Sequence, residues 1–392
     1  MRILRVAQDI FPDVVGGAPY HIHALSRDQA AKGHEVTVLT VSDDVDRPTR
    51  EQRDGYTVVQ QPPKVDLFGN KLFSNTLGQL RQRDEYDVVH AHSHLFYSTN
   101  VAALYGRFDE TPMAMTCHGL GSQRVPEWVS TTHLRTVGKW SYNTADTVFC
   151  YTPTERERLR DLGVTSRIDV IRNGIDTRRF SPDGEAVTQV ADTEGPSVLF
   201  VGRLVEGKCP HDVLAAFEQV LDSVPDATLF FAGGGPLRDD LYDATVKAGL
   251  DDSVVFLDHV PYQVMPGVYR AADLLVLASR AEGMPRTVLE ALSCGTPVVS
   301  TQLEQIVPLV EQAGETVPVG AVDELSAAIT DILGDPDRQN RLGEVGRELI
   351  TDQYDWARTV DETTAALAEL AEASDTPQAV EPAATDGGEQ PL

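Results

Sequence analysis

Two glutamates, Glu282 and Glu290, stand eight positions apart in the stretch from Ala278 to Val299. An apolar strand is predicted before them, from Asp273 to Ala278, and a second one after them, from Pro297 to Ser300. Between the strands the pattern indicates a loop and then a helix, which opens near Pro285 and ends at a Cys-Gly pair. Glu282 is therefore expected on the loop and Glu290 on the helix.

The segment between these two strands is expected to form a ligand site. Strands joined through a helix should lie parallel, and ligands of such sheets bind beyond the carboxyl ends of the strands. The first N–H groups of the helix, on Arg286, Thr287 and Val288, suit a phosphate. The alternative is a surface loop with two solvated glutamates. The glycines and the proline that surround the pair between apolar strands favour the site.

A pair of basic residues follows another predicted strand, Ser197 to Val201. Gly202 and Arg203 come directly after that strand, and Lys208 lies five residues beyond Arg203. Two cations at a strand end can offset the charge that develops on a leaving phosphate group. The alternative is a pair of solvated surface cations, and the glutamate-bearing unit further along the chain favours the phosphate clamp.

The chain opens with a β–α–β pattern, in which strands at Arg2–Gln8 and Glu35–Val41 flank a helix at Ala18–Lys32. Gly16 and Gly17 stand just before that helix. They do not complete a G-x-G-x-x-G motif, so a dinucleotide fingerprint is unsupported.

Histidines gather near two further strand ends. His118 and Gly119 follow the predicted strand Met113–Cys117, which suits a ligand site, although a structural histidine is the alternative. His90, His92 and His94 alternate along the preceding strand, where they can share one face. With His118 they are candidate zinc ligands, but no cysteine or carboxylate nearby completes a tetrahedral set. We therefore expect no metal, and we expect His90 and His92 to pack near the strand end.

The run EGMPRTVLEALSCGTPVVS, from Glu282 to Ser300, closely resembles the E-x7-E signature of family 4 glycosyltransferases. The resemblance extends from the first strand to about Trp356. It implies an α/β protein of the GT-B fold, with two Rossmann-like domains that face each other across a cleft.

The resemblance also implies roles for the candidate residues. Glu290 holds the ribose hydroxyls of the donor, Glu282 the hydroxyls of the transferred sugar, and His118 faces that sugar. The catalytic set is Glu282, His118, Arg203 and Lys208. The donor-binding set is Gly16, Gly17, Arg203, Lys208, Gly283, Thr287, Val288 and Glu290.

The expected domain organisation has two halves. Residues 1–180 form an N-terminal acceptor domain, to which a C-terminal helix at about 354–372 crosses back. An acidic linker rich in Pro and Gly, 181–196, leads to a nucleotide-sugar domain at 197–353. The tail, 374–392, is rich in Pro, Ala, Gly and acids and is expected to be disordered.

The implied function is transfer of a sugar from a nucleoside-diphosphate sugar to a glycan or lipid-linked acceptor, with retention of anomeric configuration and without a metal or other cofactor. One alternative is a sugar-nucleotide epimerase of the same fold. The E-x7-E unit and the turn Asn173–Asp176, which resembles the family's entry to the linker between domains, favour the transferase. A second is a phosphorylase of this architecture, which would use pyridoxal phosphate, but the sequence shows no convincing lysine pocket and Lys208 is already assigned to the clamp. The third is a non-catalytic glycan-binding relative. Such a relative is expected to lack Arg203, Lys208 or Glu290, and all three are present.

The sequence departs from the family pattern at three places, which bear on the identity of the donor more than on the class of reaction. No Gly-Gly turn occurs between Thr301 and Glu311. Asp258 takes a place normally held by Gly, beside the His259–Tyr262 stretch where such enzymes usually bind the base. Arg286 stands where a smaller or apolar residue is common.

Composition limits the partners and the compartment. The 392 residues carry a formal net charge of −27, and Arg greatly outnumbers Lys, as in cytosolic proteins of salt-loving organisms. An acidic protein from a mesophile is the alternative. This charge argues against nonspecific nucleic-acid binding and opposes docking on an anionic membrane unless salt screens it. The four cysteines lack a C-x-x-C spacing, which is typical of reduced thiols in the cytoplasm.

No signal peptide or membrane span is expected, because no apolar run approaches ~18 residues. The stretch from Lys64 to Arg83 mixes apolar and basic residues, among them Leu67, Lys71 and Phe73. It is either a loop that touches an acceptor or the inner membrane face, or an amphipathic helix packed on its own domain.

Overall fold

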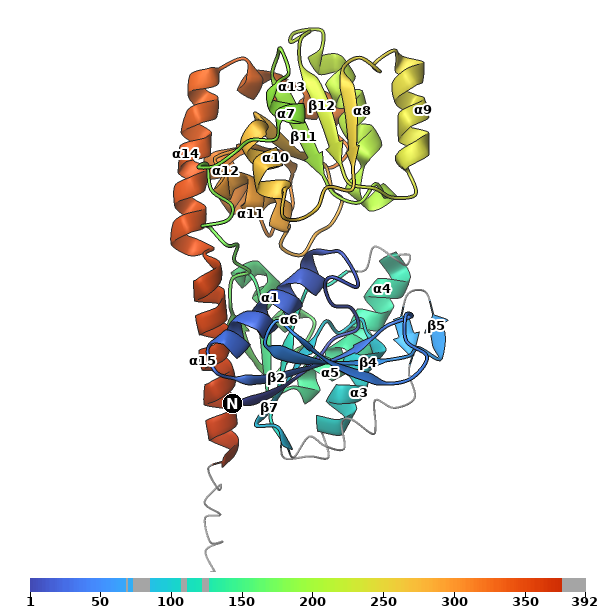
Figure 1. The fold of residues 1–392 in the computed structure, drawn as a ribbon, viewed down its shortest axis with the longest axis vertical. Coiled ribbons are helices and arrows are strands. Elements are labelled where there is room, and N and C mark those ends of the chain that lie inside the picture. Colours follow the sequence, from blue (N-terminus) through green and yellow to red (C-terminus); the bar gives the residue numbers. More distant parts are fainter. Residues whose placement is uncertain (68–69, 73–84, 107–110, 122–126, 376–392) are drawn as a thin grey trace, which may run out of the picture.

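The computed structural model describes residues 1–67, 70–72, 85–106, 111–121 and 127–375. Two mainly parallel sheets organise these residues, each with helices on both faces (Figure 1). The predicted disordered tail lies almost wholly outside the described residues.

The N-terminal domain contains an eight-stranded sheet. Its strands lie in the spatial order β10 (Arg167–Val170), β9 (Thr147–Cys150), β8 (Met113–Thr116), β7 (Val88–His92), β1 (Arg2–Val6), β2 (Glu35–Val41), β4 (Tyr56–Gln61) and β3 (Thr49–Arg53). All neighbours are parallel except the β3–β4 pair. The helices of this domain are α1 (Gly17–Ala31), α3 (Tyr97–Gly106), α4 (Glu127–His133), the π-helix η2 (Leu134–Gly138), α5 (Lys139–Thr144) and α6 (Pro153–Asp161).

The C-terminal domain contains a six-stranded parallel sheet. The spatial order is β13 (Val254–Asp258), β12 (Thr228–Ala232), β11 (Ser197–Val201), β14 (Leu274–Leu277), β15 (Val298–Thr301) and β16 (Gly314–Val317). Its helices are α7 (Thr188–Ala191), the 3-10 helix η3 (Glu206–Lys208), α8 (Pro210–Val220), α9 (Arg238–Ala248), α10 (Met265–Ala271), α11 (Arg286–Ser293), α12 (Val307–Ala313), α13 (Val322–Leu333) and α14 (Pro336–Gln353).

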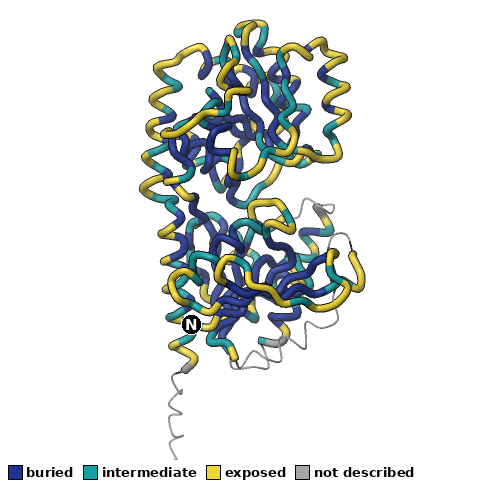
Figure 2. The backbone as a smooth tube through the Cα atoms, in the orientation of Figure 1, coloured by how far each residue is buried: buried dark blue, intermediate teal, exposed yellow. Residues whose placement is uncertain are grey.

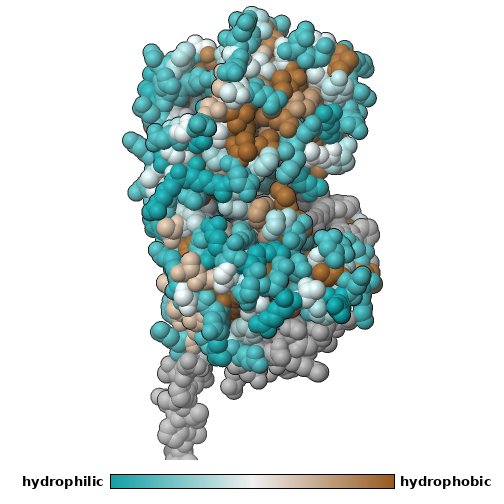
Figure 3. All heavy atoms as spheres, in the orientation of Figure 1, coloured by the Kyte–Doolittle hydropathy of each residue, from teal (hydrophilic) through white to brown (hydrophobic). Residues whose placement is uncertain are grey.

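Most inner strands are mainly apolar because helices cover both faces of each sheet, whereas the edge strand β3 is polar throughout. In β14 and β15 every residue is buried, and in β1 all but the first are. Figure 2 shows these strands as the buried interior of both domains, with the exposed residues on the outer helices and loops. The surface in Figure 3 is mostly hydrophilic, and its main apolar area lies over the C-terminal domain beside α10.

The last helix, α15 (Trp356–Asp375), leaves the C-terminal domain and packs on the N-terminal one (Figure 1). Thr364 of α15 accepts a hydrogen bond from Gln29 of α1 at 2.9 Å. At the start of the crossing, Ile175 forms a parallel bridge with Asp355, and its N–H donates to the Tyr354 carbonyl at 2.7 Å. Two chain segments therefore cross between the domains, and they are hydrogen-bonded to each other.

Two local predictions from the sequence differ from the structure. The sequence from Glu51 to Gln61 predicts one short strand, but the structure has a hairpin, β3–β4, because Asp54 (φ 47°) and Gly55 (φ 87°) form a left-handed turn. The sequence also predicts a helix from Val137 to Asp146, but the helical segment begins earlier, at Glu127, and continues through the π-helical turn η2 to Thr144. The helix predicted to open near Pro285 is confirmed, since Pro285 is the N-cap of α11.

The Lys64–Arg83 stretch is described only in part. Its described residues form two short antiparallel strands, β5 (Val65–Leu67) and β6 (Asn70–Leu72), and residues 68–69 and 73–84 lie outside the description. Within the described residues, no helix is both long enough and apolar enough to cross a membrane.

Gly233, which follows β12, is expected to tolerate no side chain. Its φ is +137°, and a Cβ there would lie 2.0 Å from the Gly202 carbonyl oxygen. Gly233→Ala should therefore lower the free energy of unfolding by more than ~2 kcal/mol, measured by urea unfolding. The neighbouring Gly234→Ala is the matched control, because a Cβ there has nothing within 4 Å. Equal stabilities of the two variants would contradict this assignment.

Candidate active site

Glu290 of α11 is a buried carboxylate with three polar neighbours. The hydroxyl of Tyr269 donates to its Oε2 at 2.8 Å, and the hydroxyl of Tyr262 donates to its Oε1 at 3.4 Å. Arg286, one turn earlier, places its Nε 3.8 Å from Oε1. Burial raises the pKa of Glu290, although the Arg286 charge and both tyrosine hydroxyls act in the opposite direction.

Glu282 lies on the loop before α11 and pairs with Lys208. The Nζ of Lys208 donates to Oε1 of Glu282, and the two side chains are only 16% and 14% exposed. The N–H of Arg280 donates to the Gly207 carbonyl at 2.9 Å, which ties the two loops together. Arg203 is exposed near the same strand end. The first glutamate and the lysine of the predicted clamp are thus direct partners.

The start of α11 offers fewer free N–H groups than the sequence suggested. The N–H of Val288 donates to the Pro285 carbonyl at 3.2 Å, because the first turn tightens at the N-cap proline. The hydroxyl oxygen of Thr287 is buried and has no hydrogen-bond partner among the described atoms. A buried hydroxyl group of this kind can donate to an anionic ligand at the helix start.

On the N-terminal domain, His118 belongs to a hydrogen-bonded row across three neighbouring strands. Its Nε2 lies 2.9 Å from Nδ1 of His92, which ends β7, and its Nδ1 lies 2.7 Å from the Tyr151 hydroxyl, which follows β9. His21 of α1 stacks edge-on at 5.4 Å and bonds Asn173 at 2.9 Å. Burial lowers the pKa of His118 to about 4, so its ring is neutral at pH 7.

The two domains touch at glycines. A Cβ on Gly283 would lie 2.8 Å from the His118 carbonyl oxygen, and one on Gly119 would lie 3.3 Å from the Gly283 Cα. A Cβ on Gly17 would lie 3.4 Å from Cδ of Arg286. The structure thus brings the Gly16-Gly17 turn, the His118-Gly119 pair and the Glu282–Glu290 unit into one place.

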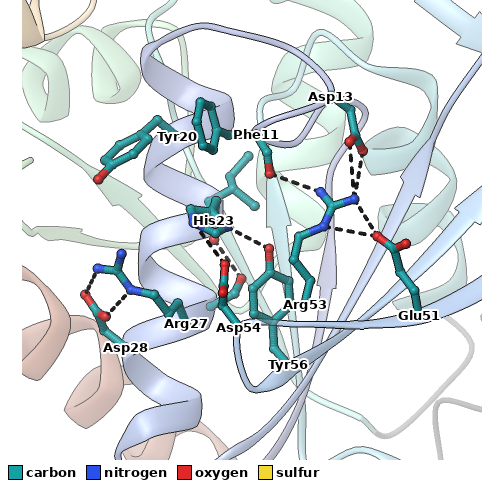
Figure 4. A network of polar contacts seen from close by, with 12 residues as sticks. Phe11, Asp13, Tyr20, His23, Arg27, Asp28, Glu51, Arg53, Asp54 and Tyr56 are labelled. Atoms are coloured by element: carbon teal, nitrogen blue, oxygen red, sulfur yellow. Dashed lines mark hydrogen bonds and ion pairs between the residues drawn. The ribbon is translucent and has the colours of Figure 1, made fainter. Parts of the chain in front are cut away.

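The loop that leads to Gly16 and Gly17 is held by Arg53 of β3. Figure 4 shows its guanidinium group donating to the Phe11 carbonyl, at 3.0 Å, and to both carboxylate oxygens of Asp13, at 3.2 Å. Gln60 donates to the same carboxylate at 2.9 Å. The hairpin β3–β4, which the sequence did not predict, therefore positions this loop.

Several residues of the site had no sequence signal. Tyr269 and Tyr20 lie in helices, where a tyrosine is as easily a core residue. Arg179 follows the Asn173–Asp176 turn, and its Cζ lies 4.3 Å from the Tyr262 ring centroid. Their roles depend on contacts between segments far apart in sequence. Among these residues, only Tyr262 has a sequence signal, because it ends the His259–Tyr262 stretch for which the family resemblance predicts a base-binding role.

The histidines do not gather around a metal position. His90 bonds Thr116 at 2.7 Å, and His94, beyond the end of β7, bonds the Tyr142 hydroxyl at 2.7 Å. His90 and His92 stack at 4.3 Å, whereas His94 turns to another partner, so the three do not act as one face. In the described ranges, no three His, Cys, Asp or Glu side chains are placed to hold a metal ion. All four cysteines are free and buried.

Two protein-family models together match most of the chain. A model described as Glycosyltransferase Family 4 matches residues 15–179, and one described as Glycosyl transferases group 1 matches residues 186–349. Glycogen synthase of Mycobacterium tuberculosis is 30% identical over 395 residues, which cover 93% of this chain and 94% of that protein. A GDP-mannose-dependent phosphatidylinositol monomannoside mannosyltransferase of Mycolicibacterium smegmatis is 29% identical, with 90% and 95% covered.

Solved structures share the fold over its full length. Sucrose-phosphate synthase from Thermosynechococcus elongatus has a TM-score of 0.82 at 22% identity, covering 95% of this chain and 99% of that one. Anabaena Alr3699/HepE in complex with UDP-glucose has a TM-score of 0.78 at 19% identity, covering 94% and 100%. At these identities the likeness concerns the fold alone.

Burial of neutral histidines predicts a pH-dependent stability. Burial lowers the pKa of all five members of this set: His21, His90, His92, His94 and His118. In the unfolded chain they bind protons near pH ~6.5, so their contribution to stability is complete above that pH and is lost as pH falls towards their folded pKa values. Each can remove up to ~1.4 kcal/mol per pH unit. Glu155 and Glu290 change the pH dependence of stability in the opposite direction, because burial raises the pKa of both carboxyl groups.

We therefore expect the free energy of unfolding to fall between pH 7 and pH 5, measured by urea unfolding at several pH values. His94, whose pKa is lowered to about 3, offers the matched variant. His94→Asn keeps a polar atom near the Tyr142 hydroxyl but cannot titrate, so its pH dependence should be shallower. A stability that does not change over this range would contradict the prediction.

Proposed function

The chain belongs to the family 4 glycosyltransferases, and we propose that it transfers a sugar from a nucleoside-diphosphate sugar to a glycan or lipid-linked acceptor with retention of anomeric configuration. The predicted GT-B fold, two Rossmann-like domains, is confirmed. The observation that carries the proposal is the placement of Glu282, paired with Lys208, and Glu290 on either side of the start of α11, opposite His118.

The leaving diphosphate is bound in this proposal by side chains rather than by a metal ion. Lys208 and Arg203 supply positive charge, and the first turn of α11 supplies the Arg286 and Thr287 N–H groups together with the orphaned Thr287 hydroxyl. Gly17 and Gly283 carry no side chain, which lets the two domains approach each other closely around the donor. Because Glu282 already holds the Lys208 side chain in place, this side chain needs little reorganisation before it binds the leaving diphosphate.

The transferred sugar and the ribose lie on different sides of this diphosphate site. Glu282 accepts hydrogen bonds from hydroxyls of the sugar, and His118, neutral at pH 7, faces the same sugar from the other domain. Glu290 accepts the ribose hydroxyls. The role of His118 requires it to exchange one of its two ring contacts, with His92 or Tyr151, for the sugar.

Retention follows a front-face course in this proposal. The bond from the anomeric carbon to the diphosphate oxygen breaks while the acceptor oxygen bonds to the same face of that carbon. The acceptor's proton passes to the leaving phosphate oxygen, so no enzymic nucleophile is required. Support comes from the cations and hydrogen-bond donors placed where negative charge develops.

Support for a hexose donor comes from one relative, which is named a GDP-mannose-dependent mannosyltransferase. We propose that this chain uses a hexose donor of the same kind in the cytoplasm, with a glycan acceptor or a lipid-linked acceptor at the inner membrane face. A thermal-shift screen of UDP-, GDP- and ADP-sugars tests this directly, because a ligand at 100 times its dissociation constant adds ~2.7 kcal/mol of stability. No shift with any of them would overturn the proposed donor class.

Loss of the cationic clamp should slow transfer. Arg203→Ala and Lys208→Ala are each expected to lower the turnover number ~10²-fold, the scale of one lost transition-state charge contact. Initial rates with the donor found by the screen measure this. Lys247→Ala, an exposed lysine in α9, is the control and should behave as wild type. Activity should persist in EDTA, and full activity of both clamp variants would rule out the assignment.

Replacing Glu290 and replacing Glu282 should have different effects on nucleotide affinity and turnover. Glu290→Gln weakens both ribose contacts, and each charged hydrogen bond is worth ~1.5–3 kcal/mol, so we expect the dissociation constant of the nucleoside diphosphate to rise ~10-fold or more. Glu282→Gln should lower turnover more than nucleotide affinity, because it contacts the sugar. Calorimetry with the free nucleoside diphosphate distinguishes them. Unchanged nucleotide affinity in Glu290→Gln would refute this division of roles.

A further inference from the structure

We propose that Tyr262 sets the nucleotide affinity of the site, because its hydroxyl occupies the place at Glu290 that a ribose hydroxyl must take. This inference rests on the proposed ribose-binding role of Glu290. Nucleotide binding then consists of an exchange, in which a ribose hydroxyl replaces the tyrosine hydroxyl on the same carboxylate oxygen.

The hydrogen bonds of Tyr262 imitate those of a ribose hydroxyl. Its hydroxyl donates to Glu290 Oε1 at 3.4 Å and accepts from Arg286 Nη2 at 3.3 Å. A sugar hydroxyl likewise donates one hydrogen and accepts another. When Tyr262 leaves, one acceptor and one donor are released together, and a single ribose hydroxyl satisfies both.

Burial shows which neighbour has to move. The side chain of Glu290 is only 6% exposed, so a ribose cannot reach it while all of its neighbours stay in place. Tyr269 is fully buried within α10, and Arg286 is buried in α11. Tyr262 is partly exposed, on the loop between β13 and α10, next to the exposed Pro261 and Gln263. Tyr262 is therefore the neighbour that can move aside.

The two tyrosine bonds also differ in length. The Tyr269 hydroxyl lies 2.8 Å from Oε2, a normal hydrogen bond, whereas the Tyr262 hydroxyl lies 3.4 Å from Oε1, near the limit for one. A ribose hydroxyl at normal distance forms a stronger bond to a carboxylate than the one it replaces. Tyr269 keeps the carboxylate oriented, and Tyr262 competes for it.

The same tyrosine connects the two domains. Its ring lies 4.2 Å from the ring of Tyr20 in α1, and Arg179 donates to its carbonyl at 2.9 Å while stacking on its ring. Arg286 in turn lies 5.2 Å from the Tyr20 ring and donates to the Gly174 carbonyl at 3.2 Å. Moving Tyr262 breaks contacts across the cleft, so nucleotide entry is coupled to the relative placement of the domains.

The test is calorimetry of Tyr262→Phe with UDP, GDP and ADP. The variant keeps the ring contacts with Tyr20 and Arg179 but removes the competing hydroxyl. We expect the nucleotide that binds the wild type to bind ~3-fold to 10-fold more tightly, the range of a lost weak hydrogen bond. Tyr269→Phe is the matched control and should bind equally or more weakly, since it removes the bond that orients Glu290.

A nucleotide without ribose hydroxyls separates competition from a structural effect. The 2′,3′-dideoxy form of the same nucleoside diphosphate does not require Tyr262 to leave Glu290, so Tyr262→Phe should give it no gain. Equal or weaker binding of the normal nucleotide by Tyr262→Phe, or an equal gain for the dideoxy form, would overturn the inference. Glu290→Gln shows whether the proposed function or only this inference is wrong. If Glu290→Gln binds the nucleotide as the wild type does, the ribose-binding role of Glu290 is wrong. If Glu290→Gln weakens binding while Tyr262→Phe changes nothing, only the exchange of hydroxyls is wrong.

Discussion

The paired chain crossing between the domains is the constraint on which the rest of the site depends. Ile175 leaves the N-terminal domain and Asp355 returns to it, and the two segments form a bridge, with the Trp356 N–H donating to the Ile175 carbonyl at 2.9 Å. A Cβ on Gly174 would lie 2.6 Å from the Thr359 hydroxyl oxygen, so the segments pack in close contact. This joint holds the carboxyl ends of the two sheets towards each other, where His118 meets Gly283.

Electrostatics at this meeting point differ from those of the whole molecule. The chain carries a formal net charge of −27, yet its candidate site brings together cations that outnumber its carboxylates. Arg179 and Arg286 flank Tyr262, Lys208 binds Glu282, and Arg203 follows the same strand as Lys208. A local excess of positive charge attracts an anion even in an acidic protein, because partly buried charges are screened less than surface ones.

Burial at the domain contact governs the protonation of its titratable groups. The histidines of the N-terminal row remain neutral because burial penalises the charged ring, and burial likewise penalises the charged form of Glu290. Neutral rings can hydrogen-bond sugar hydroxyls without repelling Arg286 or Lys208. The site therefore combines uncharged hydrogen-bonding groups on one domain with paired charges on the other, an arrangement suited to a donor with a neutral sugar and an anionic diphosphate.

The sequence alone determined the alternation of strands and helices, the loop and helix that carry Glu282 and Glu290, and the family, because apolar periodicity and glycine positions are local signals. It missed the β3–β4 hairpin, whose turn depends on two left-handed residues, and the N–H of Val288, which its own helix turn uses. Only the tertiary structure joined Lys208 to Glu282, and Tyr262 to Glu290 and Tyr20. Lys208 meets Glu282 because β11 and β14 are neighbours in one sheet, and Tyr262 meets Tyr20 because the two domains face each other. No local sequence pattern encodes either placement.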